Sequence, residues 1–350
     1  MARILYGVHG TGHGHAMRAL AVARHYPQHQ FRFISHSHGA ALLRREAEVV
    51  ECYNPETPVI GHHVAGARAL GSVARIFWQQ SCLTRRVLEE IEQFQPDVAL
   101  SDYEYFVPRA CRASGLPCLS FDHTHIVTCA RHRVPARQYV SYAATFAAIR
   151  GLFSHTSEFL VTSFYRPPLR RGARVLLVPP ILREQALQHR PSDGGHVLAY
   201  HGYSTSRGFL DFLRAIPRPI RLYGSNLLRN DGNLRFKANS EEEFLGDLAT
   251  CSYVVCGAGH TLISEALYFG KPLFVVPIRG AFEQFLNAHY VQQLGYGRYH
   301  TNLTPPPRLI PEFEAGLDGF RASIRAANFL GNTEVFAALD RFIAAKTLAP

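Results

Sequence analysis

The sequence contains few lysines. Only Lys237, Lys271 and Lys346 occur among the 37 basic residues, so arginine carries almost all of the net charge of +10. Arginine favours planar, bidentate contact with phosphate and carboxylate groups. The charge therefore leaves open a nucleotide-linked substrate, an anionic membrane surface, nucleic acid, or a solvated surface with no specific partner. Because paired zinc ligands and the aromatic strand motif of RNA-binding domains are both absent, we expect no nucleic acid.

Other features are missing, and each absence excludes a class of protein. The seven cysteines form no CxxC pair and are odd in number, which favours reduced thiols in the cytoplasm. No run of about eighteen uncharged apolar residues is present, so we expect no membrane-spanning helix. The first residues enter a strand-like run without the basic start of a signal peptide. The GxSxG and GxxxxGKS/T motifs are lacking, which excludes a nucleophile elbow and a P-loop.

Histidine is abundant instead, with 19 residues in the chain. Four close pairs are candidates for a metal site: His13 and His15, His36 and His38, His62 and His63, and His123 and His125. Zinc sites of known type use histidines four positions apart on a helix or cysteine-containing knuckles. None of these pairs has that spacing, so we expect no functional metal ion.

The apolar pattern alternates between strand-like and helix-like segments. The first half predicts strands at 3–10, 30–37, 96–102 and 116–123 and helices at 16–26, 39–48, 71–94 and 105–115. The second half predicts strands at 195–202, 218–224, 252–257 and 272–277 and helices at 205–216, 240–251 and 260–269. The Pro- and Arg-rich run 166–195 interrupts this order, and we interpret it as the end of the first domain plus a linker. The order predicts an α/β fold of two doubly wound parallel-sheet domains with a ligand cleft between them.

The most informative stretch is CGAGHTLISEALYFGKPLFVVPIRGAFEQFLNA, residues 256–288. Gly257 and Gly259 allow backbone torsions and a close approach that a side chain would block. The amide groups of His260 and Thr261 would then point out of a helix N-terminus, which is a site for an anion such as a diphosphate. Glu265 could accept hydrogen bonds from a ribose diol. A solvated surface carboxylate is the alternative interpretation of Glu265.

This stretch resembles the donor-binding signature of the UDP-glycosyltransferase and MurG-like superfamily, which has the GT-B fold. The resemblance implies that two Rossmann-like domains face one another across the cleft. It also implies that a nucleotide sugar binds to this stretch. Gly259, His260 and Thr261 would bind the diphosphate, Glu265 would bind the ribose, and Glu283 and Gln284 would bind the sugar hydroxyls. Asn287 occupies the place of the family's QxxN asparagine. His260 departs from the family, because many relatives have a small residue there.

The loop HGTGHGHAMR, residues 9–18, is open to three interpretations: a phosphate-binding glycine loop, a metal site, or a loop that presents one catalytic imidazole. It resembles the N-terminal loop of the same superfamily, in a branch with a GHxxR motif. The resemblance implies that His15 is the general base, and imidazole suits this role because its ordinary pKa lies near neutrality. His13 is the second choice for the base. The residues Gly12, His13, Gly14 and Arg18 then form an acceptor-side loop.

Two strand ends provide further candidates. Asp102 ends one predicted strand. The resemblance implies that it orients His15, as an Asp does in plant relatives. The alternative is that Asp102 caps the next helix. Asp122 and His123 end the following strand and, with His125, are acceptor-side candidates.

These inferences combine into one expectation for the whole chain. Residues 1–180 would bind the acceptor, 181–330 would bind the donor, and 331–350 would form a C-terminal helix that packs back on the first domain. The enzyme would be a metal-independent, inverting hexosyltransferase that uses a UDP- or dTDP-sugar as co-substrate and needs no cofactor. We expect a cytoplasmic location and a small-molecule or lipid-linked acceptor. Peripheral contact with the inner face of a membrane is left open. A sugar-nucleotide hydrolase or epimerase, and a noncatalytic sugar-nucleotide-binding protein, remain alternatives.

Overall fold

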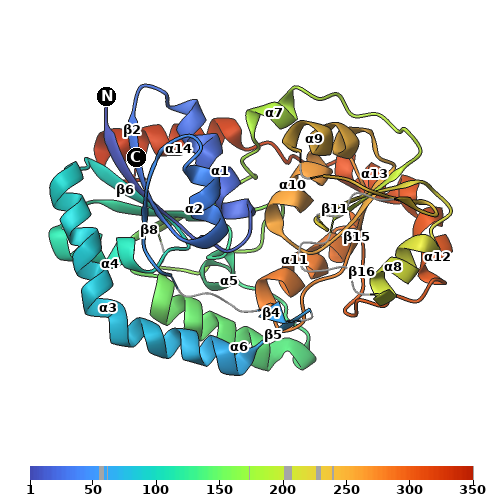
Figure 1. Ribbon diagram of the computed structural model, residues 1–350, viewed down its shortest axis with the longest axis horizontal. Coiled ribbons are helices and arrows are strands. Elements are labelled where there is room, and N and C mark those ends of the chain that lie inside the picture. Colours follow the sequence, from blue (N-terminus) through green and yellow to red (C-terminus); the bar gives the residue numbers. More distant parts are fainter. Residues whose placement is uncertain are drawn as a thin grey trace. The chain divides into compact units, whose positions relative to one another are not determined.

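The computed structural model describes residues 1–54, 59–60, 62–172, 174–200, 207–225, 230–238 and 240–349 (Figure 1). The chain divides into two compact units. The first comprises residues 1–58, 66–183 and 330–350, and the second comprises residues 59–65 and 184–329. Because the chain returns to the first unit at residue 330, the C-terminal segment belongs with the N-terminal sheet.

A seven-stranded parallel sheet forms the centre of the first unit, in the order β3-β2-β1-β6-β7-β8-β9. The strands are β1 (Arg3–Val8), β2 (Gln30–Ser35), β3 (Glu48–Glu51), β6 (Val98–Asp102), β7 (Cys118–Asp122), β8 (Glu158–Thr162) and β9 (Arg174–Val178). The central strands are apolar on both faces because helices cover both sides of a parallel sheet. Every residue of β6 is buried, for example.

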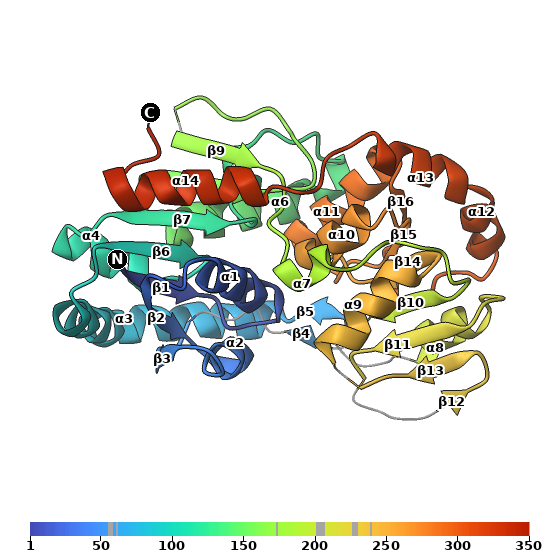
Figure 2. The same cartoon turned by 90° about the horizontal axis from the view of Figure 1, so that it is seen from above.

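Helices connect and cover these strands. They are α1 (Gly14–His25), α2 (Ser37–Leu43), α3 (Gly66–Phe94), α4 (Phe106–Ser114), α5 (Ile126–Cys129), α6 (Tyr139–Ala148) and α14 (Asn332–Ala345). Figure 2 shows α14, in red, running beside the strands of the first unit. Val335, Leu339 and Phe342 of α14 belong to the same buried apolar cluster as Tyr6 and Leu160, which explains why the C-terminal helix packs here.

The second unit repeats the architecture with the sheet order β12-β13-β11-β10-β14-β15-β16. The strands are β10 (Val197–Tyr200), β11 (Ile220–Tyr223), β12 (Asn230–Asp231), β13 (Leu234–Phe236), β14 (Tyr253–Cys256), β15 (Leu273–Val275) and β16 (Gly297–Tyr299), and only β12 pairs antiparallel. The helices are α7 (Glu184–Leu187), α8 (Arg207–Arg214), α9 (Glu241–Thr250), α10 (His260–Tyr268), α11 (Phe282–Gln293), α12 (Leu309–Ala315) and α13 (Leu317–Arg325). A hairpin of β4 (Val59–Ile60) and β5 (His63–Val64) joins this unit through a parallel bridge between His63 and Arg279.

The α/β class with two parallel-dominated sheets is confirmed. The run 166–195 is more ordered than the linker interpretation allows, because it contains the edge strand β9 and the short helix α7. The unit boundary falls between residues 183 and 184, where we expected one between 180 and 181. Parts of two expected elements, at residues 201–202 and 205–206, lie outside the described residues. In the part of the chain that the structure describes, no helix combines the length and apolar character needed to cross a membrane.

Candidate active site

Polar side chains gather where three strands of the first sheet end. His9 follows β1, Asp102 ends β6, and Asp122 ends β7. The parallel register pairs Val8 with Asp102, and the His9 amide donates to the Asp102 carbonyl at 3.0 Å. Because the carboxyl ends of parallel strands lie at one sheet edge, the edge collects residues that are far apart in the sequence.

His15 and Asp102 are in direct contact. The Nδ1 atom of His15 lies 2.7 Å from Oδ1 of Asp102, as the sequence predicts for a paired base and carboxylate. Arg18 donates to both oxygens of the same carboxylate, from Nε at 2.7 Å and from Nη2 at 2.8 Å. Asp102 is fully buried, Arg18 is buried, and His15 is partly exposed. The arrangement is therefore a His–Asp–Arg cluster in which only the imidazole reaches solvent.

The chemistry of the cluster follows from its donors and acceptors. An ionised carboxylate only accepts and a guanidinium only donates, so we assign the Nδ1 proton of His15 to the bond with Asp102. This assignment leaves the Nε2 lone pair as the basic site. Burial opposes the charge of Arg18, but the charge and hydrogen bonds of Asp102 outweigh it and raise the pKa of Arg18 above its ordinary value. Arg18 is thus a partner of the carboxylate, and its place in the acceptor-side loop stays a prediction.

The alternative role of Asp102 as a helix cap is wrong. The helix after β6 is capped by Glu104, whose carboxylate accepts from the amide groups of Phe106 at 3.0 Å and Val107 at 2.5 Å. Burial raises the pKa of Glu104 to about 7, although these hydrogen bonds oppose the shift. Asp102 remains available to His15 and Arg18.

The loop before α1 combines a tight turn with a close backbone approach. Gly12 has a φ of +81°, a conformation that favours glycine. A side chain at Gly10 would collide with the backbone of His36, so the start of α2 lies directly against this loop. His13 is exposed at the N-cap position of α1, whereas His15 lies two residues further along the helix and contacts Asp102. The geometry favours His15 over His13 as the oriented imidazole.

A second buried carboxylate, Asp122, also pairs with a histidine. Asp122 accepts from Ser120 Oγ at 2.8 Å, and its other contacts are with His125, through the backbone amide at 2.8 Å and the ring Nδ1 at 2.7 Å. His123 instead donates from Nδ1 to the carbonyl of Thr162 at 2.8 Å. Burial would raise the pKa of Asp122, but the contacts with His125 and Ser120 hold it below its usual range. Of the three acceptor-side candidates, Asp122 and His125 are thus in direct contact, and His123 bonds to the backbone of β8.

Tyr103 lies near both histidine–aspartate pairs, His15 with Asp102 and His125 with Asp122. Its φ is +51°, unusual for a residue with a side chain. Its ring centroid lies 6.3 Å from that of His15 and 6.3 Å from that of His125. Sequence reasoning missed Tyr103 because an aromatic residue after a strand carries no signal of its backbone conformation.

Two further histidines, His9 beside His15 and His36 beside His9, have lowered pKa values and are neutral near pH 7. Burial lowers the pKa of His9 well below its ordinary value, and His15 and His36 lower it further. Burial also lowers the pKa of His36 to about 4. Among the residues that the structure describes, no three His, Cys, Asp or Glu side chains are arranged to hold a metal ion.

In the second unit, the turn after β14 leads into the N-terminus of α10. Gly259 is the exposed N-cap residue, with φ −70° and ψ 130°. A Cβ atom at Gly257 or Gly259 would meet nothing within 4 Å, and neither residue has a positive φ. The expected torsional need for these glycines is therefore wrong. What they provide is open space in front of the amide groups of His260 and Thr261.

The side chains of α10 turn into the protein. Glu265 is only 2% exposed, so it is not a solvated surface carboxylate. His260 is also buried, and its Nε2 lies 3.4 Å from Ser264 Oγ, so its imidazole folds back along its own helix. Thr261 is half-buried at the open end of the helix. The departure at residue 260 therefore leaves the helix N-terminus uncovered.

Helix α11 fixes the two loops that flank it. Asn287 is fully buried and donates from Nδ2 to the carbonyl of Ala258 at 3.0 Å, which anchors the glycine turn. Gln284 accepts through Oε1 from the amide of Ile278 at 3.0 Å, which closes the loop before α11. Glu283 is half-buried beside it. Glu283 and Gln284, the residues expected to bind the donor sugar, thus lie one helical turn before Asn287, which anchors the loop expected to bind the diphosphate.

Comparison with known sequences decides the family. Residues 2–314 match glycosyl transferase family 1. The chain belongs to this family. An uncharacterized glycosyltransferase of Methanosarcina acetivorans is 24% identical over 336 residues, which cover 87% of each chain.

Solved glycosyltransferases share the fold. MurG of Acinetobacter baumannii has a TM-score of 0.59 and 15% identity, over 97% of this chain and 100% of its own. Phytolacca americana UGT2, in complex with UDP-2-fluoro-glucose and pterostilbene, has a TM-score of 0.66 and 13% identity, over 98% and 100%. This glycosyltransferase therefore has the GT-B fold, and the predicted resemblance to the UDP-glycosyltransferase and MurG-like superfamily is confirmed.

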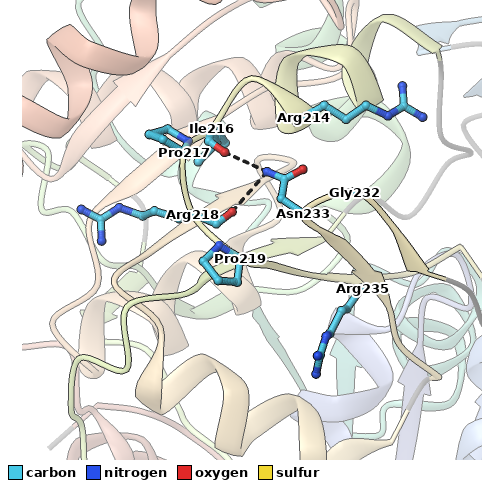
Figure 3. Close-up of a pocket in the computed structure, with 8 residues that line it drawn as sticks. All are labelled: Arg214, Ile216, Pro217, Arg218, Pro219, Gly232, Asn233 and Arg235. Carbon is cyan, nitrogen blue, oxygen red and sulfur yellow. Dashed lines mark hydrogen bonds between the residues drawn. The ribbon is translucent and has the colours of Figure 1, made fainter.

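The glycosyltransferase also has an arginine-lined pocket in its second unit (Figure 3). Arg218 precedes β11 and Asn233 precedes β13, so the pocket lies where the strands begin, at the opposite sheet edge from the N-terminus of α10. Arg214 pairs with Asp211 and Asp231, and Arg218 pairs with Glu314. Two of its three arginines are thus already compensated, and the pocket is separate from the expected donor site.

Proposed function

We propose that this glycosyltransferase transfers a hexosyl group from a UDP- or dTDP-sugar to an acceptor hydroxyl, with inversion and without a metal ion. The contact between His15 and Asp102, at 2.7 Å, is the observation that carries the proposal. It orients an imidazole with a basic Nε2 at the carboxyl edge of a parallel sheet, where ligands of this fold class bind. The nucleotide sugar in the UGT2 complex supports the choice of donor.

The first unit supplies the base. Nε2 of His15 takes the proton of the acceptor hydroxyl while the hydroxyl oxygen attacks the anomeric carbon. Asp102 accepts from Nδ1 and stabilises the imidazolium that forms. Positioned proton transfer of this kind contributes about 10²- to 10⁴-fold in rate. A single displacement from the face opposite the leaving group inverts the anomeric centre.

The second unit supplies the leaving-group site. The bond from the anomeric carbon to the diphosphate oxygen breaks, and the diphosphate departs with the electron pair. The amide groups at the start of α10, from Gly259 to Thr261, stabilise the added charge. Glu265 holds the ribose, and Glu283 with Gln284 holds the sugar hydroxyls. The acceptor is a small molecule or a lipid-linked molecule.

The test separates binding from turnover. Purified protein is screened against a panel of nucleotide sugars by thermal shift, because a ligand that binds only the folded state raises the melting temperature. With the donor that binds, we expect His15→Ala to retain donor affinity and to lose at least about 10²-fold in turnover. His38→Ala, an exposed histidine on α2, is the matched control.

Three outcomes would contradict the proposal. Near-normal turnover by His15→Ala would end the role of the base. Rapid loss of donor without acceptor would indicate a sugar-nucleotide hydrolase. Donor binding without any conversion, across a broad acceptor panel, would indicate a noncatalytic binding protein.

A further inference from the structure

Helix α6 presents apolar side chains to solvent. Its ten residues, YVSYAATFAA, contain no charged side chain, and none of them is buried. Tyr139 is 63% exposed and Val140 is 84% exposed. At about 100° per residue, the exposed positions occupy one half of the helix, and all of them are apolar: Tyr139, Val140, Ala143, Ala144, Ala147 and Ala148. The other half holds Ser141 and Thr145 together with the aromatic Tyr142 and Phe146, and all four are half-buried. An ordinary surface helix has polar or charged residues on its exposed half, and α6 has none there.

The chain around α6 is strongly basic. Residues 123–183 contain nine arginines, no lysine and a single acid, Glu158, and so carry +8 of the net charge of +10. Glu158 is 4% exposed, and it accepts from the amide of Leu348 and the hydroxyl of Thr347, each at 2.6 Å. Glu158 also accepts from Arg174 Nη1 at 3.3 Å, and the segment has no second carboxylate to balance its other arginines.

Arginines border α6 at both ends and along one side. Arg133 and Arg137 precede the helix, Arg150 follows it, and all three are exposed. The run 166–171 lies alongside, because Arg170 donates to Tyr142 Oη at 2.7 Å and its guanidinium lies 5.0 Å from the ring centre of Phe146. We call this surface, the exposed half of α6 with its flanking arginines, the α6 surface.

We propose that the α6 surface docks on an anionic lipid bilayer, with the helix lying in the plane of the interface. An apolar strip bordered by cations is the pattern of interfacial helices. Arginines near an anionic surface add to the binding, and within residues 123–183 the only carboxylate, Glu158, is buried. A symmetric dimer through this surface would bring two arginine borders together, which disfavours a second copy as the occupant.

Vesicle co-sedimentation of the full chain tests the proposal, without donor or acceptor. We expect binding to vesicles of phosphatidylcholine with phosphatidylglycerol, and little binding to phosphatidylcholine alone. Val140→Asp and Ala144→Asp each place a charge on the apolar strip and should weaken binding at least about tenfold. Arg133→Gln with Arg137→Gln should weaken it about fivefold per arginine. Matched controls in the second unit are Ala322→Asp and Arg235→Gln, both exposed.

Each contrary result overturns the proposal. Equal binding to neutral and anionic vesicles, no binding to either, or unchanged binding by the Asp variants would each do so, provided that the melting temperatures match wild type. A wild-type dimer in sedimentation equilibrium that Val140→Asp dissociates would identify the α6 surface as an interface between copies instead. Because the measurement involves no sugar transfer, its failure leaves the proposed function standing.

Discussion

The candidate site of the first unit depends on side chains, and the candidate site of the second unit depends on backbone amide groups. In the first unit, the chemistry depends on charged side chains that hold one another: His15, Asp102 and Arg18 form a cluster in which two of the three are buried. In the second unit, the expected anion site consists of backbone amide groups at the start of α10, with open space in front of Gly259. Side chains appear there mainly as supports, such as Asn287 beneath the turn.

This difference explains how each candidate site should respond to substitution. A buried ion cluster fails when one member is removed, since the remaining charge is left without its partner. A backbone site cannot be deleted by exchanging a side chain, and it responds only when something is added in front of it or a support is removed. The first unit should therefore lose stability and activity together, whereas the second should lose affinity alone.

The largest expected effect is that of Asp102→Asn. It leaves Arg18 buried without a carboxylate and His15 without an anionic acceptor. We expect the free energy of unfolding, measured by urea denaturation, to fall by about 3–5 kcal/mol, and turnover to fall at least about 10²-fold.

The double variant Arg18→Met with Asp102→Asn separates the two losses. Removing both charges should restore most of the stability and none of the turnover. If turnover returned together with stability, Asp102 would be a structural residue only.

Much of the fold follows from local pattern, because continuous apolar runs such as β1 and β6 are hard to read as anything but buried strands. Elements whose stability comes from distant partners were missed. Strand β9 lies within an Arg- and Pro-rich run and is held by pairing with β8. The hairpin at residues 59–65 joins the second unit through contacts with Arg279, and no local pattern reports such a contact.

The candidate site shows the same division. The contact of His15 with Asp102 was predicted from the family resemblance, together with the rule that strand ends meet at one sheet edge. Arg18 as the third member had a usable signal, since residues three apart lie on the same side of a helix. The pairing of Asp122 with His125 rather than His123 had none, because it depends on how the chain turns after β7.

Glu265 tests whether a side chain of the second unit takes a direct part in binding. Hydrogen bonds to a charged group contribute about 1.5–3 kcal/mol, so Glu265→Gln should weaken UDP about tenfold to a hundredfold in a calorimetric titration. Glu242→Ala, an exposed acid on α9, should leave UDP affinity unchanged. Unchanged UDP affinity in Glu265→Gln would remove the ribose role.

Gly259→Ala tests the open space in front of α10. Its torsions suit alanine and a Cβ atom would meet nothing, so the folded state should be at least as stable as wild type. The methyl group should nevertheless crowd a bound diphosphate and weaken UDP about tenfold, within the range of overpacking effects. Gly319→Ala, on α13, also has open space and should keep its UDP affinity. Loss of stability in Gly259→Ala would show that the turn itself requires glycine.

The smallest effect belongs to Gln284, where support and recognition can be separated. Its Oε1 accepts from the amide of Ile278, so Gln284→Glu keeps this loop contact while removing the two N–H donors. If those donors reach the sugar, Gln284→Glu should weaken the sugar nucleotide about fivefold, the value of about one hydrogen bond, and leave bare UDP unchanged. Gln292 lies on the same helix and accepts in a similar way from the amide of Tyr299, and Gln292→Ala should affect neither ligand. Equal losses for both ligands in Gln284→Glu would mean that Gln284 acts on the diphosphate turn, and the sugar would have to be held by other residues.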